Sequence, residues 1–191
     1  MDHRDHVNLL RDGVLHGGGV WADLGSGGGA FTLALADLLG TGSMIYSIDR
    51  DRRALRRQAD AMRAAFPGVE ARYLHDDYTE PIDMPPLDGV VMANALHFQR
   101  DRDKPSILSR IHSYLKPGGR LIIVEYNTDR GNLWVPHPFS YSTWERLAAN
   151  AGFVETRLLA TRPSRNLREI YSAMSARPVG SVLHHGRSIG E

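Results

Sequence analysis

The chain has 191 residues, which suits one domain with a continuous core. Charged residues make up 24% of the sequence and apolar residues 42%, as in an average globular protein, so fibrous and wholly disordered classes are excluded. The formal net charge of +1 gives no general attraction to nucleic acid, and the absence of Cys excludes disulfides, thiolate metal sites and cysteine nucleophiles.

The residue pattern also disfavours a membrane-spanning protein and a secreted protein. No apolar run is long enough to span a bilayer, and residues 1–20 lack the pattern of a signal peptide. We therefore expect a cytoplasmic protein with neither a membrane nor a nucleic acid partner. The nine His are scattered without metal-ligand spacing, so no metal site is predicted.

Short β-branched runs alternate with longer segments of helical period, which predicts βαβ units and a mainly parallel sheet. The predicted strands, in chain order, are residues 20–24, 44–49, 69–75, 89–93 and 120–126. The predicted helices are residues 30–39, 52–66, 104–115 and 140–151, each followed closely by glycine or proline.

The C-terminal part of the sequence departs from this alternation. Two strand-like runs, residues 153–161 and 167–174, are separated by so few residues that only an antiparallel pair is possible. The parallel sheet is thus predicted to end in a hairpin. We expect residues 1–176 to form a single domain with a short N-terminal cap at residues 1–16, and residues 177–191 to be a flexible tail.

A glycine-rich turn at residues 23–29, Asp-Leu-Gly-Ser-Gly-Gly-Gly, joins the first predicted strand to the first helix. Such glycines allow a sharp turn and let a ligand approach the amides of the helix N-terminus. Gly25, Gly27 and Ala30 also satisfy the dinucleotide spacing, so the spacing alone does not identify the ligand. Asp23 favours a ligand with an ammonium group, because its carboxylate would repel a diphosphate.

Asp49 ends the second predicted strand, where it is placed to accept hydrogen bonds from two ribose hydroxyls. The alternative role for this residue is the N-cap of the following helix. The ribose role suits an adenosyl ligand and an NAD ligand equally.

Further segments follow the glycine turn and Asp49 in order: residues 75–78 (His-Asp-Asp-Tyr), 87–94 (Leu-Asp-Gly-Val-Val-Met-Ala-Asn) and 115–120 (Leu-Lys-Pro-Gly-Gly-Arg). Together, these five signals resemble the class I S-adenosylmethionine-dependent methyltransferases, over about residues 21–174. The resemblance implies a Rossmann-like three-layer α/β sandwich whose seven-stranded, mostly parallel sheet has an antiparallel strand in the C-terminal hairpin. It also implies S-adenosyl-L-methionine as the cofactor.

The resemblance assigns roles to individual residues. It implies that the methionine part is held by Asp23, Gly25, Ser26 and Gly27, and that Asp49, with Arg50 beside it, binds the ribose. It further implies that Asp77 accepts from the adenine amino group and Tyr78 lies against the ring. Asp76 is the alternative to Asp77, and a solvated turn is the alternative for both. Asn94 would close the pocket, or else form an Asx turn.

Methyl transfer from a sulfonium is an in-line displacement, so a base is needed only when the acceptor must lose a proton. Candidate groups lie past the fourth and fifth strands, where open α/β sheets bind ligands. The catalytic candidates are His97, Glu125 and His137, with Tyr126 also in range. A packing role at a helix start is the equal alternative for His97.

Two segments bear on the acceptor. The aromatic loop at residues 127–139, which includes Trp134 and Phe139, either forms a substrate wall or packs beneath itself. Arginines cluster around the hairpin turn, where they either bind an anion or, as the sequence favours, form a solvated turn. They are Arg157, Arg162, Arg165 and Arg168.

The sequence therefore predicts a methyltransferase that acts on an unidentified small-molecule acceptor. One alternative is an NAD-linked oxidoreductase, disfavoured by Asp23 and by the absence of a Tyr-x-x-x-Lys pair after the fifth strand. The other is a non-catalytic module that binds S-adenosylmethionine without turnover.

Overall fold

The computed structural model describes residues 1–14, 17–164 and 167–180. The elements of this part of the chain are, in order, α1 (His3–Leu10), β1 (Val20–Leu24), α2 (Ala30–Leu39), β2 (Met44–Asp49), α3 (Arg52–Ala65), β3 (Glu70–His75), β4 (Leu87–Ala93), the 3-10 turn η1 (Leu96–Phe98), α4 (Lys104–Tyr114), β5 (Leu115–Tyr126), α5 (Tyr141–Asn150), β6 (Val154–Pro163) and β7 (Glu169–Ala176).

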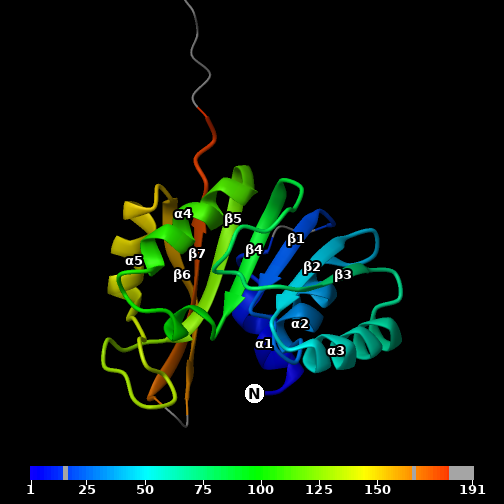
Figure 1. The fold of residues 1–191 in the computed structure, drawn as a ribbon, viewed down its shortest axis with the longest axis horizontal. Helices are drawn as coiled ribbons and strands as arrows, with labels where there is room; N and C mark the ends of the chain where they lie inside the picture. The colour runs from blue at the N-terminus through cyan, green and yellow to red at the C-terminus, as the bar shows by residue number, and fades with distance from the viewer. Residues whose placement is uncertain (15–16, 165–166, 181–191) are drawn as a thin grey trace, which may run out of the picture.

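The strands form one seven-stranded sheet in the order β3-β2-β1-β4-β5-β7-β6 (Figure 1). Strands β1 to β5 pair in parallel, and β7 runs antiparallel to both β5 and β6. It follows that β6 has the same direction as β1 to β5. The predicted mostly parallel sheet with an antiparallel C-terminal strand is confirmed.

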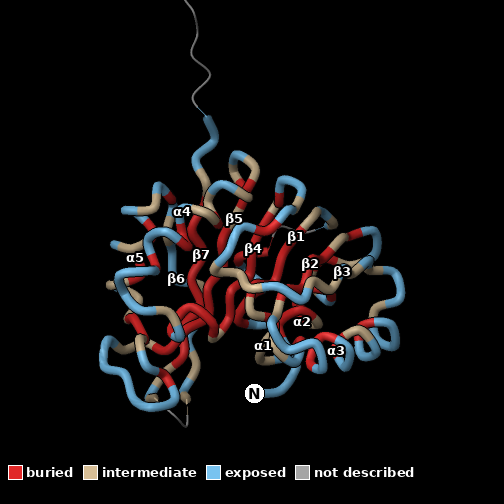
Figure 2. Tube along the Cα trace, viewed as in Figure 1, coloured by how far each residue is buried: buried red, intermediate tan, exposed pale blue. Residues whose placement is uncertain are grey.

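Helices cover both faces of the sheet, which gives three layers. One apolar cluster joins the strands to α4 and α5 through residues such as Ile107 and Trp144, and the other joins them to α1, α2 and α3 through residues such as Leu35 and Met62. The red, buried segments of the central strands in Figure 2 lie between these helices. Burial of both strand faces explains why the strands read as nearly continuous apolar runs.

The clearest boundary difference is in β5, which begins at Leu115 and not at residue 120. Leu115 pairs with Leu87, and a register shift then separates this pair from the one between Gly89 and Arg120. Local sequence gives no signal for this pairing, because Pro117 and the glycines after it are typical of a turn.

The N-terminal segment contains a helix that the sequence analysis did not predict. Asp2 and Asp5 form a capping box at the start of α1, and Val7, Leu9 and Leu10 are buried. The ring of His6 packs edge-on against Phe31 of α2 at 4.8 Å. The helix therefore belongs to the α2 side of the core.

The predicted tail begins at residue 177, and its first residue is paired with the sheet. Arg177 N–H donates to the Gly119 carbonyl at 2.8 Å, and Gly118 N–H donates to the Arg177 carbonyl at 3.0 Å. Residues 181–191 lie outside the described residues, so the tail stays a prediction there. Among the helices that the structure describes, none is long and apolar enough to cross a membrane.

Candidate functional site

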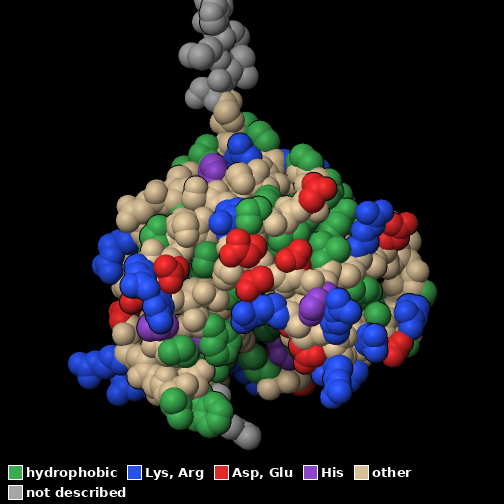
Figure 3. All heavy atoms as spheres, viewed as in Figure 1, with side chains coloured by type: hydrophobic (Ala, Val, Ile, Leu, Met, Phe, Trp, Pro, Cys, Tyr) green, Lys and Arg blue, Asp and Glu red, His purple; other side chains and the backbone are tan. Residues whose placement is uncertain are grey.

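A cavity of about 170 Å³ lies where the carboxyl ends of β1, β2 and β4 meet. Seven residues line it: Gly25, Asp49, Arg50, Tyr78, Asn94, Ala95 and Phe98. The first five of these residues were predicted cofactor contacts. In the view of Figure 3 a hollow opens at the lower edge of the molecule, toward which β1 and β4 point in Figure 1. Open α/β sheets bind their ligands at this edge.

The glycine turn is fixed to the neighbouring strand. The N–H groups of Gly25 and Ser26 both donate to the carbonyl of Ile48, at 2.9 and 3.0 Å. Gly25 has φ +75°, and a Cβ added there would lie 2.8 Å from the Cβ of Ala95. A side chain at this position would be strained and would close the cavity, so glycine is required.

Asp49 holds the turn and faces the cavity. Its Oδ2 accepts from Gly27 N–H at 2.7 Å, and its Oδ1 accepts from Asp51 N–H at 2.8 Å. Each carboxylate oxygen keeps a second acceptor position, which leaves two for a pair of ligand hydroxyls. Asp51, and not Asp49, caps α3, because it accepts from the N–H groups of Arg53 and Ala54.

Asp23 lies beneath the glycine turn, away from the cavity lining. It is 1% exposed, and its Oδ2 accepts from the Thr32 hydroxyl at 2.6 Å. Burial raises the pKa of Asp23 to about 7; the Thr32 hydrogen bond opposes this rise and the nearby charge of Asp49 adds to it. The ammonium contact proposed for Asp23 stays a prediction.

A buried chain of hydrogen bonds continues from Asp23 to the far side of the turn. Gln58 Nε2 donates to Thr32 Oγ1 at 2.9 Å, and Ser47 Oγ donates to Gln58 Oε1 at 2.5 Å. Ser47 Oγ also lies 2.7 Å from Ser26 Oγ. This chain, the turn relay, links β1, α2, α3 and β2 below the predicted cofactor site.

The sequence analysis missed Thr32, Ser47 and Gln58. Gln58 was detectable, because it occupies a buried position between Leu55 and Met62 on the apolar stripe of α3. Its side chain fills the space that a Cβ on Gly29 would need, and Gly29 has φ +85°. The lack of a side chain at Gly29 therefore leaves the space that the Gln58 side chain occupies.

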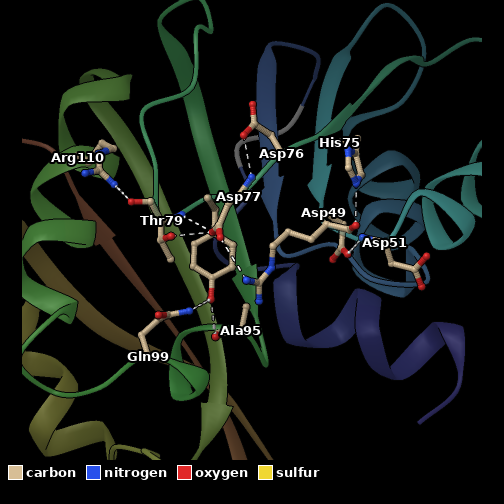
Figure 4. Close-up of polar contacts among 11 residues, drawn as sticks. Asp49, Asp51, His75, Asp76, Asp77, Thr79, Ala95, Gln99 and Arg110 are labelled. Carbon is tan, nitrogen blue, oxygen red and sulfur yellow. Dashed lines mark hydrogen bonds and ion pairs between the residues drawn. The ribbon is translucent and has the colours of Figure 1, made fainter.

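The two acids that follow β3, Asp76 and Asp77, have different surroundings in the structure. Asp77 Oδ1 accepts from the backbone N–H of Thr79 at 2.9 Å and from its hydroxyl at 2.7 Å, and Oδ2 lies 3.2 Å from Arg50 Nη1. Burial alone would raise the pKa of Asp77, but these hydrogen bonds and the Arg50 charge lower it. Asp77 points into this group of side chains and Asp76 points away from it (Figure 4). The geometry favours Asp77 over the exposed Asp76.

Tyr78 connects two segments across the cavity. Its hydroxyl donates to the Ala95 carbonyl at 2.9 Å and accepts from Gln99 Nε2, also at 2.9 Å. Burial raises the pKa of this phenol, so it stays neutral and donates at physiological pH. The ring gives the cavity a flat wall beside Gly25, as the adenine role requires, although that role itself stays a prediction.

Asn94 has an unsatisfied polar atom at the cavity. Its backbone is left-handed, with φ +50°, and its N–H donates to the Val124 carbonyl at 2.8 Å. Its Oδ1 is buried and has no hydrogen-bond partner among the described residues, so it makes no Asx turn with them. A buried acceptor without a partner is costly, and a ligand donor would remove that cost.

His97 and Glu125 form a buried pair behind the cavity wall. His97 Nδ1 lies 2.7 Å from Glu125 Oε2, and the two side chains are 3% and 0% exposed. Glu125 Oε1 also accepts from the N–H groups of Leu96 and His97, at 3.0 and 3.2 Å. Glu125 therefore holds the turn η1, whose last residue, Phe98, reaches the cavity.

The third catalytic candidate, His137, lies on the loop after β5. Its N–H donates to the His97 carbonyl at 3.0 Å, and its own carbonyl accepts from the buried Lys104 Nζ at 2.7 Å. Its backbone thus joins the loop to η1. The catalytic role of its side chain stays a prediction.

Part of the aromatic loop packs into the core, and for its exposed residues the substrate wall stays a prediction. Val135 and Phe139 are buried, at 3% and 1% exposure, and belong to the core. Trp134 is 79% exposed and Leu133 is 89% exposed.

The four hairpin arginines do not share one environment. Arg157 donates to the Asp12 carbonyl, and Arg162 forms an ion pair with Asp5. Arg165 lies outside the described residues, and Arg168 is exposed. In the described residues, no group of three His, Cys, Asp or Glu side chains could hold a metal ion.

Comparison with known proteins identifies the family. Residues 22–119, 98 of the 191 in the chain, match the family model described as a methyltransferase domain. The chain belongs to this methyltransferase family. The predictions of the S-adenosylmethionine-dependent family and of S-adenosyl-L-methionine as its cofactor are thus confirmed, and the NAD-linked alternative is not supported.

Two curated relatives are carboxy-S-adenosyl-L-methionine synthases. The protein from Shewanella frigidimarina is 30% identical over 104 residues, which are 54% of this chain and 42% of that protein. The protein from Hydrogenovibrio crunogenus is 32% identical over 103 residues, which are 54% of this chain and 41% of that protein. The match therefore spans less than half the length of these relatives.

Solved methyltransferase structures share the fold. An S-adenosylmethionine-dependent methyltransferase from Methanosarcina mazei has a TM-score of 0.71 at 16% identity, covering 90% of this chain and 97% of that one. The 1,6-didemethyltoxoflavin-N1-methyltransferase of Burkholderia thailandensis has a TM-score of 0.71 at 20% identity, covering 92% and 78%.

Proposed function

We propose that the protein transfers a methyl group from S-adenosyl-L-methionine to a small-molecule acceptor. The observation that carries this proposal is the cavity at the carboxyl ends of β1, β2 and β4, where Asp49 and Asn94 present unused acceptor positions beside the glycine turn. Family membership supports it. The toxoflavin-type neighbour, whose name states a small-molecule substrate, supports the acceptor class.

The residues present fit the cofactor chemically. The two free positions on the Asp49 carboxylate match a ribose diol, and the buried Asn94 Oδ1 matches an ammonium donor. The cavity is smaller than the roughly 300–1,000 Å³ of typical ligand pockets. Arg50 and Phe98 line the cavity with exposed side chains, which are free to rotate outward when a ligand enters.

When bound, the cofactor supplies a methyl group that is already activated on a sulfonium, so the protein mainly orients the acceptor and excludes water. We propose that His97 accepts the proton when the acceptor must lose one. Glu125 supports this role, because its contact with Nδ1 favours the tautomer whose Nε2 is a base. The proposed contribution of His137 rests only on its position beside His97.

We further propose that residues 1–176 act as one methyltransferase domain in the cytoplasm. The single sheet, which takes up strands from residue 20 to residue 176, supports the domain boundaries. The absence of Cys fits a reducing compartment.

Two measurements test the methyl transfer. Calorimetry should detect S-adenosylhomocysteine binding and no NAD binding. Incubation with methyl-labelled cofactor and a metabolite extract should then move label into a small molecule and release S-adenosylhomocysteine. Cofactor binding without any label transfer would favour the non-catalytic module, and a cofactor that gains the mass of a carboxylate would favour the chemistry named for the two curated relatives.

A further inference from the structure

A second and larger cavity lies at the same edge of the sheet as the proposed active site. Its volume is about 440 Å³, and it is lined by residues 127–130 of the loop after β5 and by Leu167 and Arg168 of the β6–β7 hairpin. Because β6 runs parallel to β5, this hairpin lies at the same sheet edge as the carboxyl ends of β4 and β5. We call this cavity the hairpin groove.

The hairpin groove is lined by two arginines that form no ion pair within the part of the chain that the structure describes. Arg130 and Arg168 come from segments far apart in sequence, and neither forms an ion pair with a described residue. Guanidinium groups bind carboxylates and phosphates through paired hydrogen bonds. Two unpaired guanidinium groups lining one groove therefore favour an anionic ligand.

The acidic side chains at the groove are already engaged. Asp129 accepts from the N–H of Ser140 at 2.9 Å and from its hydroxyl at 2.8 Å, which places its charge at the start of α5. Burial would raise the pKa of Asp129, but these hydrogen bonds and the charge of Arg146 lower it. Glu169 accepts from Asn127 Nδ2 at 2.8 Å. These hydrogen bonds satisfy part of each acid's capacity, whereas both guanidinium groups remain available.

The groove is built on a fixed backbone. Asn127 N–H donates to the Glu169 carbonyl at 3.0 Å, and Asn127 Oδ1 accepts from Tyr141 N–H at 3.0 Å, so the loop is tied to both β7 and α5. Arg168 has φ +48°, a left-handed conformation that costs energy in a residue with a side chain. Its carbonyl is held by Ser164 N–H at 2.8 Å.

Exposed apolar side chains occur both in the loop that lines the groove and at the cofactor cavity. Leu133 and Trp134 follow Arg130 in the loop, and Phe98 of the cofactor cavity is 58% exposed. The hydrogen bond from His137 N–H to the His97 carbonyl joins this loop to the turn that carries Phe98. Figure 3 shows hydrophobic side chains at the lower end of the molecule with Lys and Arg side chains to one side.

We propose that the hairpin groove binds the carboxylate or phosphate of an amphipathic methyl acceptor, with Arg130 and Arg168 as its anion contacts and Trp134 and Phe98 against its apolar part. The proposal rests on the proposed methyl transfer and names the chemical class of the acceptor. An acceptor of this kind satisfies the unpaired charges and covers the exposed rings at the same time.

The first experiment measures binding without turnover. Phenyl phosphate and benzoate are the anionic probes, and benzamide is the neutral control. Trp21 and Trp144 are both 0% exposed, so quenching of the exposed Trp134 reports the probe. We expect saturable binding of at least one anionic probe, no comparable binding of benzamide, and a loss of about tenfold or more in affinity in the double variant Arg130→Gln, Arg168→Gln. Arg63→Gln, on the distant helix α3, is the matched control.

Three outcomes of the binding experiment would contradict the proposal. Absence of binding by both anionic probes, equal binding by benzamide, or an unchanged affinity in the double variant would overturn the proposal. The double variant should bind S-adenosylhomocysteine as the unchanged protein does, because neither arginine lines the cofactor cavity. A loss of that binding would show general damage to the fold. The affinities of the single variants Arg130→Gln and Arg168→Gln for the anionic probes would then test the proposal.

The second experiment reads the charge of the product. Label transferred from the cofactor in a metabolite extract should appear in a compound that an anion exchanger retains, and the double variant should form it more slowly. A neutral or cationic labelled product would overturn the proposal. A complete absence of labelled product would count against methyl transfer itself, whereas the hairpin groove would still be judged by the probe measurements.

Discussion

At the residue scale, Asp23 is a buried acid whose protonation should be visible in stability. Its pKa rises from 3.8 in the unfolded chain to about 7 in the folded protein, so between these values the folded state binds more protons. The free energy of unfolding therefore falls as pH rises through this window. We expect the stability difference between the protein and Asp23→Asn to change by roughly 2 kcal/mol between about pH 5.5 and about pH 8, in favour of the variant at the higher pH.

Urea unfolding at the two pH values measures this difference. Groups other than Asp23 titrate in both proteins, so their effects cancel when the two curves are subtracted. A difference that does not change with pH would mean that Asp23 keeps an ordinary pKa in the folded state.

Asp49 is the residue on which ribose binding depends. Replacement by Ala removes the acceptor of the Gly27 and Asp51 amides together with the two positions open to a ligand. We expect S-adenosylhomocysteine affinity to fall by roughly 1–3 kcal/mol in calorimetry. Asp60→Ala, which breaks an exposed ion pair with Arg63 within α3, is the control. Equal affinity in the two variants would show that the ribose lies elsewhere.

At the element scale, Gln58 determines how α3 meets the glycine turn. Gln58→Met keeps the volume of the side chain but leaves the hydroxyls of Thr32 and Ser47 without their amide partner. We expect a loss of roughly 1–3 kcal/mol in the free energy of unfolding, measured in urea. Arg57→Met, an exposed change on the same helix, should stay within about 0.5 kcal/mol of the unchanged protein. Similar losses in both variants would remove the turn relay as the cause.

The turn η1 depends in the same way on Glu125. This carboxylate serves two backbone N–H groups and the His97 ring in a fully buried site. Glu125→Ala should therefore lower the free energy of unfolding by roughly 3–5 kcal/mol, because it leaves these buried hydrogen-bond donors without an acceptor and opens a cavity. Thermal or urea unfolding measures the loss, with the exposed Glu80→Ala as the control. A loss as small as that of the control would mean that η1 holds its shape without the pair.

At the scale of the whole molecule, cofactor binding should stabilise the folded chain by mass action. S-adenosylhomocysteine at about 100 times its dissociation constant adds about 2.7 kcal/mol, which raises the melting temperature of a domain of this size by roughly 5–10 °C. The same concentration of NAD should leave it unchanged. A rise with NAD, or no rise with S-adenosylhomocysteine at saturation, would contradict the assignment.

Most of the fold was predictable because its signals are local. The short, mainly apolar runs at β1 and β2 and the Ala-rich and Leu-rich segment of α2 gave their boundaries directly, since strand and helix periods are properties of neighbouring residues. The glycine turn pointed to a ligand for the same reason. The extended start of β5 was missed, because it depends on pairing between Leu115 and Leu87, which lie far apart in sequence.

The sequence by itself determined the fold class, the family and the segments that surround the cofactor cavity, because these are encoded in the period of each segment and in several short motifs that are each contiguous. The tertiary structure alone decided which polar atoms are hydrogen-bonded within the protein and which remain free for a ligand. It buried Asp23 under the turn with Gln58, directed Asp77 inward and Asp76 outward, and placed Arg130 and Arg168 in one groove. These outcomes depend on burial and on distances between segments remote in sequence, which local patterns do not contain.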